Sequence, residues 1–170
     1  MPRKPPRLTH LDAANRPAMV DVGAKAATFR EASAEATVKL PPAVARALAA
    51  TGHRTKKGPV FDTAIIAGVM AAKRTHELIP FCHPLALERC SVDIATARGG
   101  AIHIICNVAV HHKTGVEMEA LVGATAAALT IYDMCKALSH DIEIGTVRLT
   151  RKTGGKRDFK RKPAVRKARR

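Results

Sequence analysis

Apolar and polar residues alternate with a period of two in one part of this chain, which predicts a strand with one buried face. The alternation lies in residues 102–110, and its apolar members are Ile102, Ile104, Cys106, Val108 and Val110. Another apolar run starts at Ser91, and Gly99 and Gly100, a pair typical of a hairpin turn, separate the two runs. Further extended segments are expected at residues 19–22, 26–40 and 142–152.

Two shorter segments have the spacing and the end signals of helices. The prolines at 41–42 favour a helix start, and Gly52 is a natural C-terminal stop for that helix. Asp62 is expected to cap a second helix over residues 63–78, which Pro80 ends.

The longest helical segment is TGVEMEALVGATAAALTIYDMCKAL, residues 114–138. Thr114 and Glu117 have the spacing of a capping box, so the helix is expected to begin there. Its predicted apolar stripe consists of Met118, Leu121, Val122, Leu129 and Tyr132. The alanines and Gly123 would let another backbone come close. Because helices and antiparallel strands interleave, the sequence favours an α+β sandwich.

The positive charge is concentrated at the two ends of the chain. The formal net charge is +15, but residues 1–10 carry three cations, and residues 156–170 carry nine cations and one Asp, so residues 11–155 are only about +4. We expect residues 1–10 to be a basic flexible arm, residues 11–155 a single domain, and residues 156–170 a basic, disordered tail. A nucleic-acid contact by the tail is possible but less favoured. The five aromatic residues leave little surface for base stacking.

The four cysteines are Cys82, Cys90, Cys106 and Cys135. Their spacing fits neither a disulfide framework nor a CxxC metal motif, so they are typical of reduced thiols. The sequence shows no apolar leader and no uninterrupted apolar run long enough to cross a membrane. These features predict a cytoplasmic protein without a membrane partner.

The stretch LIPFCHPL, residues 78–85, places Cys82 beside His83 between two prolines. Zinc binding is disfavoured because adjacent residues rarely aim at one ion and no further ligand pair is present. A nucleophilic thiolate would need an activating partner, and His83 is badly placed to face its neighbour. Two interpretations of His83 stay open: a loop histidine bonded to a nearby carbonyl, or an imidazole held by the prolines for anion binding or proton donation.

Charged residues at two other places have both an ordinary and a functional interpretation. Lys56 and Lys57 form either an exposed charge pair or part of a phosphate-binding loop bounded by glycines. Asp133 and Lys136 have the spacing of a helical ion pair. Glu119 lies roughly 21 Å along the helix from Asp133, at ~1.5 Å per residue. If both ends are functional, the site should therefore be shared between subunits.

Three motifs carry a resemblance: AAKRTHELIPFCHPL, KTGVEMEALVGATAAALTIYDMCKA and KTGGK. Over residues 8–159 the chain resembles the molybdenum cofactor biosynthesis protein C (MoaC) family. The resemblance implies a lyase, a cyclic pyranopterin monophosphate synthase, which converts (8S)-3′,8-cyclo-7,8-dihydroguanosine 5′-triphosphate to cyclic pyranopterin monophosphate and diphosphate in molybdenum cofactor (molybdopterin) biosynthesis. It implies a ferredoxin-like antiparallel sheet packed by helices, in a homohexamer (a trimer of dimers) with intersubunit active sites. No cofactor is required, and Mg²⁺ is possible with the triphosphate.

The same resemblance assigns roles to residues by position. Asp133, Lys57 and Lys136 match the catalytic aspartate and lysines of the family. The substrate-binding positions are Phe81, Cys82, His83, Met118, Glu119 and Lys152, and no metal ligand is implied. We hypothesise that the two lysines perform acid/base steps, that Asp133 orients Lys136, and that the clustered ammonium groups lower one another's pKa. The chain departs from the family pattern at Thr153, at Arg157 and in its basic tail.

Overall fold

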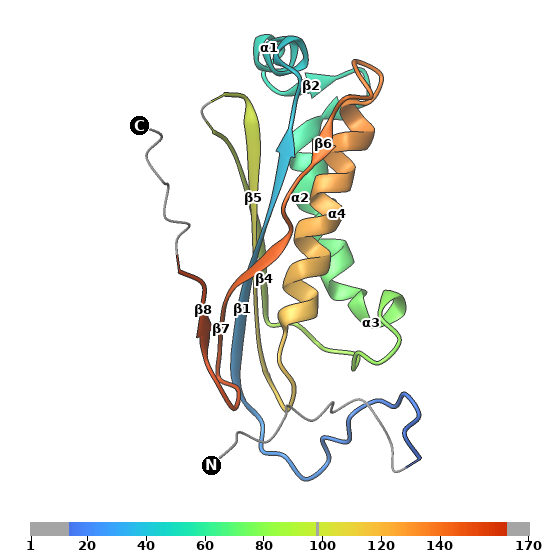
Figure 1. Ribbon diagram of the computed structural model, residues 1–170, viewed down its shortest axis with the longest axis vertical. Helices are drawn as coiled ribbons and strands as arrows, with labels where there is room; N and C mark the ends of the chain where they lie inside the picture. Colours follow the sequence, from blue (N-terminus) through green and yellow to red (C-terminus); the bar gives the residue numbers. More distant parts are fainter. Residues whose placement is uncertain (1–13, 98, 163–170) are drawn as a thin grey trace.

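The computed structural model describes residues 14–97 and 99–162 of the chain (Figure 1). The described helices are α1 Pro42–Ala50, α2 Val60–Lys73, α3 Thr75–Leu78 and α4 Glu117–Cys135. The described strands are β1 Thr28–Lys39, β2 Arg54–Thr55, β3 Gly58–Pro59, β4 Arg89–Thr96, β5 Ala101–His112, β6 Glu143–Ile144, β7 Arg148–Thr153 and β8 Phe159–Lys160. Helices and strands interleave along the chain, so the predicted α+β class is confirmed.

One antiparallel sheet runs along the long axis of the molecule (Figure 1). Its strands follow the order β4-β5-β1-β7-β8, and β6 pairs with β1. Strands β1 and β5 pair over their whole length, from Thr28 opposite His112 to Lys39 opposite Ala101. The first strand therefore lies inside the sheet, between the last two long strands of the chain. The short strands β2 and β3 form a separate hairpin.

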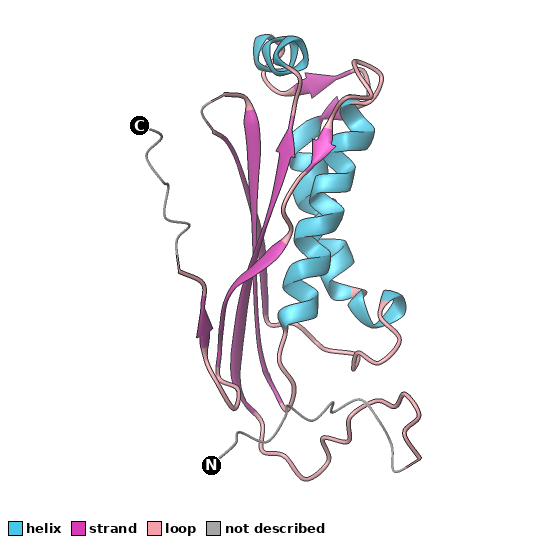
Figure 2. Cartoon of the chain, viewed as in Figure 1, coloured by secondary structure: helices cyan, strands magenta, loops and turns pink. Residues whose placement is uncertain are grey.

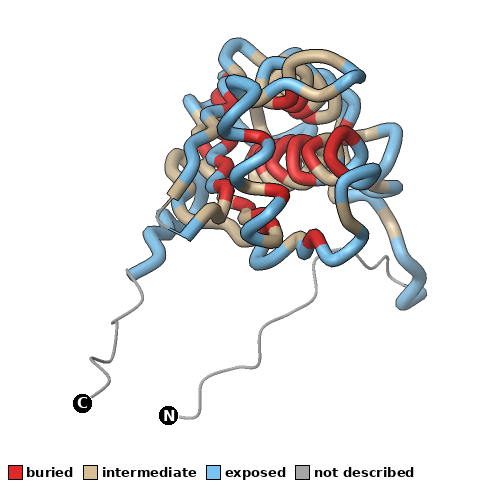
Figure 3. Tube along the Cα trace, turned by 90° about the horizontal axis from the view of Figure 1, so that it is seen from above, coloured by how far each residue is buried: buried red, intermediate tan, exposed pale blue. Residues whose placement is uncertain are grey.

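Helices α2 and α4 cover one face of this sheet, and the core lies between the two layers (Figure 2). Viewed along the long axis, the buried positions gather in this interior (Figure 3). The two helices meet through Gly68 and Gly123: a Cβ atom on Gly68 would lie 2.9 Å from the carbonyl oxygen of Gly123. The small residues therefore allow close contact between the helices, as expected for Gly123.

Several predicted elements are confirmed. All five apolar residues of the alternating run 102–110 are buried, and Cys106 is fully buried. Gly99 and Gly100 have φ values of 82° and 80°, a left-handed conformation that glycine adopts without strain at a turn. The extended segment 26–40 corresponds to β1, and α1 ends just before Gly52.

The predicted start and length of the second helix are wrong. Helix α2 begins at Val60, with Pro59 at the N-cap, and Asp62 lies in the first turn instead of capping it. The backbone N–H of Val60 donates to the carbonyl oxygen of His53, which ties the helix start to the preceding hairpin. The helix ends at Lys73, and a separate single turn, α3, carries the helical segment to Leu78, the end expected before Pro80.

The predicted capping box of α4 is wrong as well. The helix begins at Glu117 with Val116 at the N-cap, and no side-chain hydrogen bond caps it. The carboxylate of Glu117 accepts a hydrogen bond from Lys152, while Thr114 contacts His112. An ion pair to the neighbouring strand thus replaces the local cap.

The predicted apolar stripe of α4 is not its buried face. Leu129 is 55% exposed, and the other four members of the stripe are only partly buried. The buried positions are Glu119, Ala120, Gly123, Ala124, Ala127, Ala128, Ile131, Met134 and Cys135. Small side chains occupy this face because α2 and the sheet approach it closely, which leaves little room for leucine.

The two ends of the domain also differ from the prediction. Residues 19–22 form a loop, and the expected strand 142–152 is divided into β6 and β7. Strand β8 pairs with β7, so the sheet continues past the predicted domain boundary at residue 155. The predicted basic arm, and residues 163–170 of the predicted tail, lie outside the described residues.

Candidate active site

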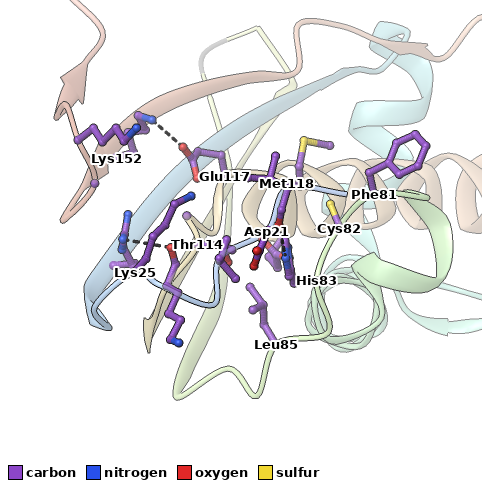
Figure 4. A pocket seen from close by; sticks show the side chains of 18 of the residues that line it. Asp21, Lys25, Phe81, Cys82, His83, Leu85, Thr114, Glu117, Met118 and Lys152 are labelled. Atoms are coloured by element: carbon purple, nitrogen blue, oxygen red, sulfur yellow. Dashed lines mark hydrogen bonds and ion pairs between the residues drawn. The ribbon is translucent and has the colours of Figure 1, made fainter. Parts of the chain in front are cut away.

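A pocket of about 760 Å³ opens at the end of the molecule where α4 begins (Figure 4). It lies between residues 20–25 before β1, the loop 81–85, the first turn of α4, and residues 152–156 at the end of β7. All six predicted substrate-binding residues line it: Phe81, Cys82, His83, Met118, Glu119 and Lys152. The fold thus brings these six positions together from three separate segments of the sequence.

The pocket has an apolar side and a charged side (Figure 4). Phe81, Cys82 and Met118 lie on one side of the view, with Asp21 and His83 beside them, and Lys25 and Lys152 lie on the other. The cationic residues of the lining are Lys25, Arg30, Lys113, Lys152 and Lys156, and the acidic ones are Asp21, Glu117 and Glu119. This polarity suits a ligand with a ring at one end and negative charge at the other.

Several cations of the pocket are held by hydrogen bonds within the chain. Lys152 Nζ lies 2.7 Å from Glu117 Oε1, and Lys113 Nζ donates to the carbonyl oxygen of Gly23 at 2.7 Å. The guanidinium of Arg30 donates to two backbone carbonyls of the segment that leads into α4. These bonds restrain the positive groups before a ligand arrives, which lowers the entropic cost of binding.

Glu119 is the buried carboxyl group of this pocket, with only 4% of the residue exposed. Burial raises its pKa to about 7; a hydrogen bond from its own backbone N–H opposes the rise, and the negative charge of Glu117 adds to it. A helix N-terminus favours a nearby anion by about 0.3–1 kcal/mol. Desolvation therefore outweighs the helix dipole at this position.

Cys82 shares the environment of Glu119. Burial raises the pKa of the Cys82 thiol, and the negative charge of Glu119 raises it further. A thiol with a raised pKa carries little thiolate near neutral pH, so this environment does not favour a nucleophilic role for Cys82. Cys82 instead forms part of the pocket wall.

His83 bonds to the segment that closes one side of the pocket. Its Nε2 lies 3.0 Å from the carbonyl oxygen of Val20, and because a carbonyl only accepts, Nε2 must be the donor. Of the two interpretations left open by the sequence, the structure therefore contains the loop histidine that bonds a nearby carbonyl. Nδ1 is the ring nitrogen that remains for a ligand.

The three predicted catalytic residues meet at the opposite end of α4. The β2–β3 hairpin brings Lys57 to the helix, where its Nζ lies 2.7 Å from Asp133 Oδ2 and 2.9 Å from the Asp133 carbonyl oxygen. Lys136 Nζ lies 2.9 Å from Asp133 Oδ1. A smaller hollow of about 440 Å³, lined by Lys57, Lys136 and residues 137–140, adjoins this cluster.

The charges of this cluster shift its pKa values in a direction that differs from the prediction. Hydrogen bonds from Lys57 and Lys136 lower the pKa of Asp133. The hydrogen bond to Asp133, followed by its charge, raises the pKa of Lys136. The expected lowering is therefore wrong for Lys136, because the carboxylate lies between the two ammonium groups and its attraction dominates.

Within one chain, the pocket and the catalytic cluster are separate. The lining of the pocket contains Glu119 but not Lys57, Asp133 or Lys136. Glu119 and Asp133 are separated by roughly 21 Å of helix at ~1.5 Å per residue. One small ligand therefore cannot contact both groups in the same subunit.

Comparison with known proteins agrees with the motifs. A sequence model of the MoaC family matches residues 19–155. The chain belongs to the MoaC family. This membership confirms the resemblance seen in the sequence.

Relatives of this MoaC-family chain match nearly its whole length. A Xanthomonas oryzae pv. oryzae protein named cyclic pyranopterin monophosphate synthase is 59% identical over 153 residues, which are 90% of this chain and 93% of that protein. A Xanthomonas campestris pv. campestris protein of the same name is 58% identical over the same shares. A Synechocystis protein named molybdenum cofactor biosynthesis bifunctional protein is 48% identical over 159 residues, 91% of this chain and 46% of that protein.

The pocket of this MoaC-family chain includes residues that the sequence did not single out. Lys25, Arg30 and Asp21 line it, but they lie before or within β1, where neither spacing nor periodicity distinguishes them from ordinary charged residues. Lys113 opens the motif KTGVEMEA, so its position beside the helix start was the available signal. These residues reach the pocket through tertiary contacts, which local sequence patterns do not predict.

Residues 14–97 and 99–162 contain neither a membrane-spanning helix nor a cluster of metal-ligand side chains. No helix in these ranges is long and apolar enough to cross a membrane. The same ranges contain no group of three or more His, Cys, Asp or Glu residues arranged for a metal ion.

Proposed function

We propose that this chain is the lyase that converts (8S)-3′,8-cyclo-7,8-dihydroguanosine 5′-triphosphate to cyclic pyranopterin monophosphate and diphosphate, as a step of molybdenum cofactor biosynthesis. One observation carries the proposal: in a chain of the MoaC family, one pocket gathers the six positions that the sequence resemblance assigns to substrate binding. The names of the full-length relatives and of the bifunctional relative support the same activity and pathway.

The two sides of the pocket fit the two parts of this substrate. Its volume of about 760 Å³ lies within the roughly 300–1,000 Å³ of typical ligand pockets. The apolar side suits the fused ring, and the lysines and Arg30 offset the charge of the triphosphate. No resident cofactor is required in this proposal, and Mg²⁺ can accompany the triphosphate. The cytoplasmic location stays a prediction.

Lys57, Asp133 and Lys136 perform the proton transfers in this proposal. Because Asp133 remains ionised and raises the pKa of Lys136, Lys136 enters the reaction protonated and acts first as a proton donor. Lys57 bonds to the other oxygen of the same carboxylate, so Asp133 orients both ammonium groups. The positive pair also stabilises negative charge that develops as phosphate bonds form and break.

The active site is shared between subunits of a homohexamer, a trimer of dimers, in this proposal. The strand order β4-β5-β1-β7, with helices on one face, fits a ferredoxin-like unit. The separation between Glu119 and Asp133 along α4 favours a site in which one subunit supplies the pocket and another supplies the acid/base cluster. The mass of the purified chain in solution tests the assembly: a stable, fully active monomer would refute it.

The activity is tested by incubating the purified chain with the cyclised nucleotide and measuring the cyclic pyranopterin and diphosphate. Lys136→Ala should lower the turnover by about 10²-fold or more, the usual range for losing a general acid or base. Lys39→Ala is the control, because Lys39 is an exposed lysine that pairs with Glu143 and lines neither the pocket nor the hollow beside the acid/base cluster. Unchanged turnover in a folded Lys136→Ala variant would remove that residue from the mechanism.

Mixing two inactive variants tests whether the site is shared. Lys136→Ala damages the acid/base cluster, and Glu119→Gln damages the pocket. Random dimers of the two variants contain one intact site in each heterodimer, so roughly a quarter of the wild-type activity should return. If no activity returns after the variants are coexpressed and found in one oligomer, both groups act from the same subunit.

A further inference from the structure

The β2–β3 hairpin carries Lys57 to the end of α4, but its own strands do not hold it in place (Figure 1). The two strands have two residues each, and a two-stranded hairpin of this size is marginally stable at best in water. The ion pair between Lys57 and Asp133 adds little, because about half of each side chain is exposed and water competes for both charges. Contacts at the base of the hairpin must therefore fix its position.

His53, at the base of this hairpin, has a strained backbone. Its φ is 61°, and among the described residues other than glycine only Asn15 also has a positive φ. Two backbone hydrogen bonds of 2.9 Å stabilise this conformation: the N–H of His53 donates to the carbonyl oxygen of Leu48, and its carbonyl oxygen accepts from Val60. Glycine would adopt the same conformation without strain. A histidine here therefore indicates that the side chain has a role.

The imidazole ring of His53 connects the hairpin to α2. It stacks on the ring of Phe61, with the two centroids 4.4 Å apart and an angle of 25° between the planes. Phe61 lies in the first turn of α2 and packs against the hydrophobic core, and α2 is itself in close contact with α4, the helix that carries Asp133. His53 lines neither the pocket nor the hollow beside the acid/base cluster. Its side chain therefore acts on the hairpin and not on a ligand.

We propose that His53 is a positioning residue: its ring, stacked on Phe61, holds the hairpin so that Lys57 Nζ stays within hydrogen-bond distance of Asp133. The inference rests on the proposed function for the part that Lys57 takes in turnover, but not for the position of Lys57. A displacement of about 1 Å at a reacting group can lower a rate by roughly 10²-fold. Loss of the ring contact should therefore lower kcat, while KM, which depends on the separate pocket, changes little.

Acylation of the lysines of the full chain by acetic anhydride, followed by mass spectrometry, tests the position of Lys57 without relying on turnover. Lys56, its exposed neighbour in the same turn, is the internal control. In the wild type Lys57 should react more slowly than Lys56, because its ammonium group is bonded to Asp133. His53→Asn, which tolerates a positive φ but has no ring, and Phe61→Leu should both bring the two rates together, whereas Phe61→Tyr should preserve the difference. Equal rates in the wild type, or an unchanged difference in His53→Asn and Phe61→Leu, would overturn the proposal.

Turnover of the cyclised nucleotide then shows whether His53 acts through Lys57. His53→Asn should lower kcat roughly tenfold or more and change KM by less than about twofold. In a Lys57→Ala background, measured at high enzyme concentration, the same substitution should lower kcat no further, because the group that it positions is gone. A further loss in that background, or a rise in KM without a fall in kcat, would refute the positioning role. If the labelling changes but kcat is unaffected by both His53→Asn and Lys57→Ala, the positioning holds and the catalytic role of Lys57 in the proposed function is refuted.

Discussion

Replacing Glu119 by glutamine should make the domain more stable at alkaline pH while it damages the site. Glu119 is 4% exposed, and the pKa of its carboxyl rises from an ordinary 4.5 to about 7 on folding. Because the folded-state value is the higher one, the favourable contribution of this group is complete below pH 4.5 and is lost as the pH rises through about 7. Glutamine carries no charge, so this loss is absent in the variant.

The size of the effect follows from the two pKa values. Each unit of pKa corresponds to about 1.4 kcal/mol, so above pH 7 the charged form destabilises the folded chain by up to on the order of 3 kcal/mol. At pH 5.5 the same relation gives only about 1.4 kcal/mol. Burying the glutamine amide has its own cost, but that cost does not depend on pH. The stability difference between variant and wild type should therefore grow by about 2 kcal/mol between pH 5.5 and pH 8.

Urea unfolding at equal protomer concentration measures this difference. With a slope of about 2 kcal/mol per molar urea, the unfolding midpoint of Glu119→Gln relative to wild type should rise by roughly 1 M more at pH 8 than at pH 5.5. Glu117→Gln is the control: its carboxylate is paired with Lys152, so the variant should be no more stable than wild type at pH 8. If the difference in stability between Glu119→Gln and wild type is the same at both pH values, the reasoning is refuted. Burial would then not raise the pKa of the Glu119 carboxyl.

Three further predictions concern the packing, the pocket wall and the end of the sheet. Gly123→Ala places a Cβ atom 2.6 Å from Cys106 Sγ, so we expect the free energy of unfolding in urea to fall by about 1–3 kcal/mol. Cys106→Ala should partly relieve this loss; an equal loss with Cys106 and with Ala at position 106 would contradict the contact. His83→Phe removes the donor to Val20 and should raise KM more than it lowers kcat, with partial recovery in His83→Gln; a fall in kcat alone would indicate direct chemistry by His83. A chain that ends at residue 155 lacks β8 and should unfold about 1–3 kcal/mol more easily than one that ends at residue 162; equal stability would show that β8 adds nothing.

The parts of the fold that were predicted correctly have strong local signals. The alternation in residues 102–110 and the glycine pair at 99–100 fix β5 and its hairpin through backbone geometry alone. The buried face of α4 was missed because its small residues carry little hydrophobicity, and only the contact with Gly68 explains why they are buried. Glu117 has the spacing of a capping-box residue, but its carboxylate accepts a hydrogen bond from Lys152, far away in the sequence, instead of capping the helix.

The candidate site, too, was predicted only in part from the sequence. The motifs identified six residues that line the pocket but missed cations such as Lys25 and Arg30. The helix length already indicated that Glu119 and Asp133 belong to different places in one chain. The direction in which the pKa of Lys136 shifts was not predictable from the residue types of the cluster. It depends on the distances from the Asp133 carboxylate to the two ammonium groups, which are 2.7 Å for Lys57 and 2.9 Å for Lys136. Distances decide whether attraction or repulsion dominates.

Helix α4 links these observations, because it carries pocket residues at its start and Asp133 near its end. The close contact between Gly68 and Gly123 fixes α2 against α4, and the hairpin that carries Lys57 leads directly into α2. The acid/base cluster is therefore held at a set distance from the pocket of the same chain. In the proposed dimer, a two-fold axis that brings the start of one α4 near the end of the other would complete two identical sites at once. Packing between the helices would then control the geometry of catalysis, so a substitution such as Gly123→Ala should lower activity at temperatures where the chain is still folded.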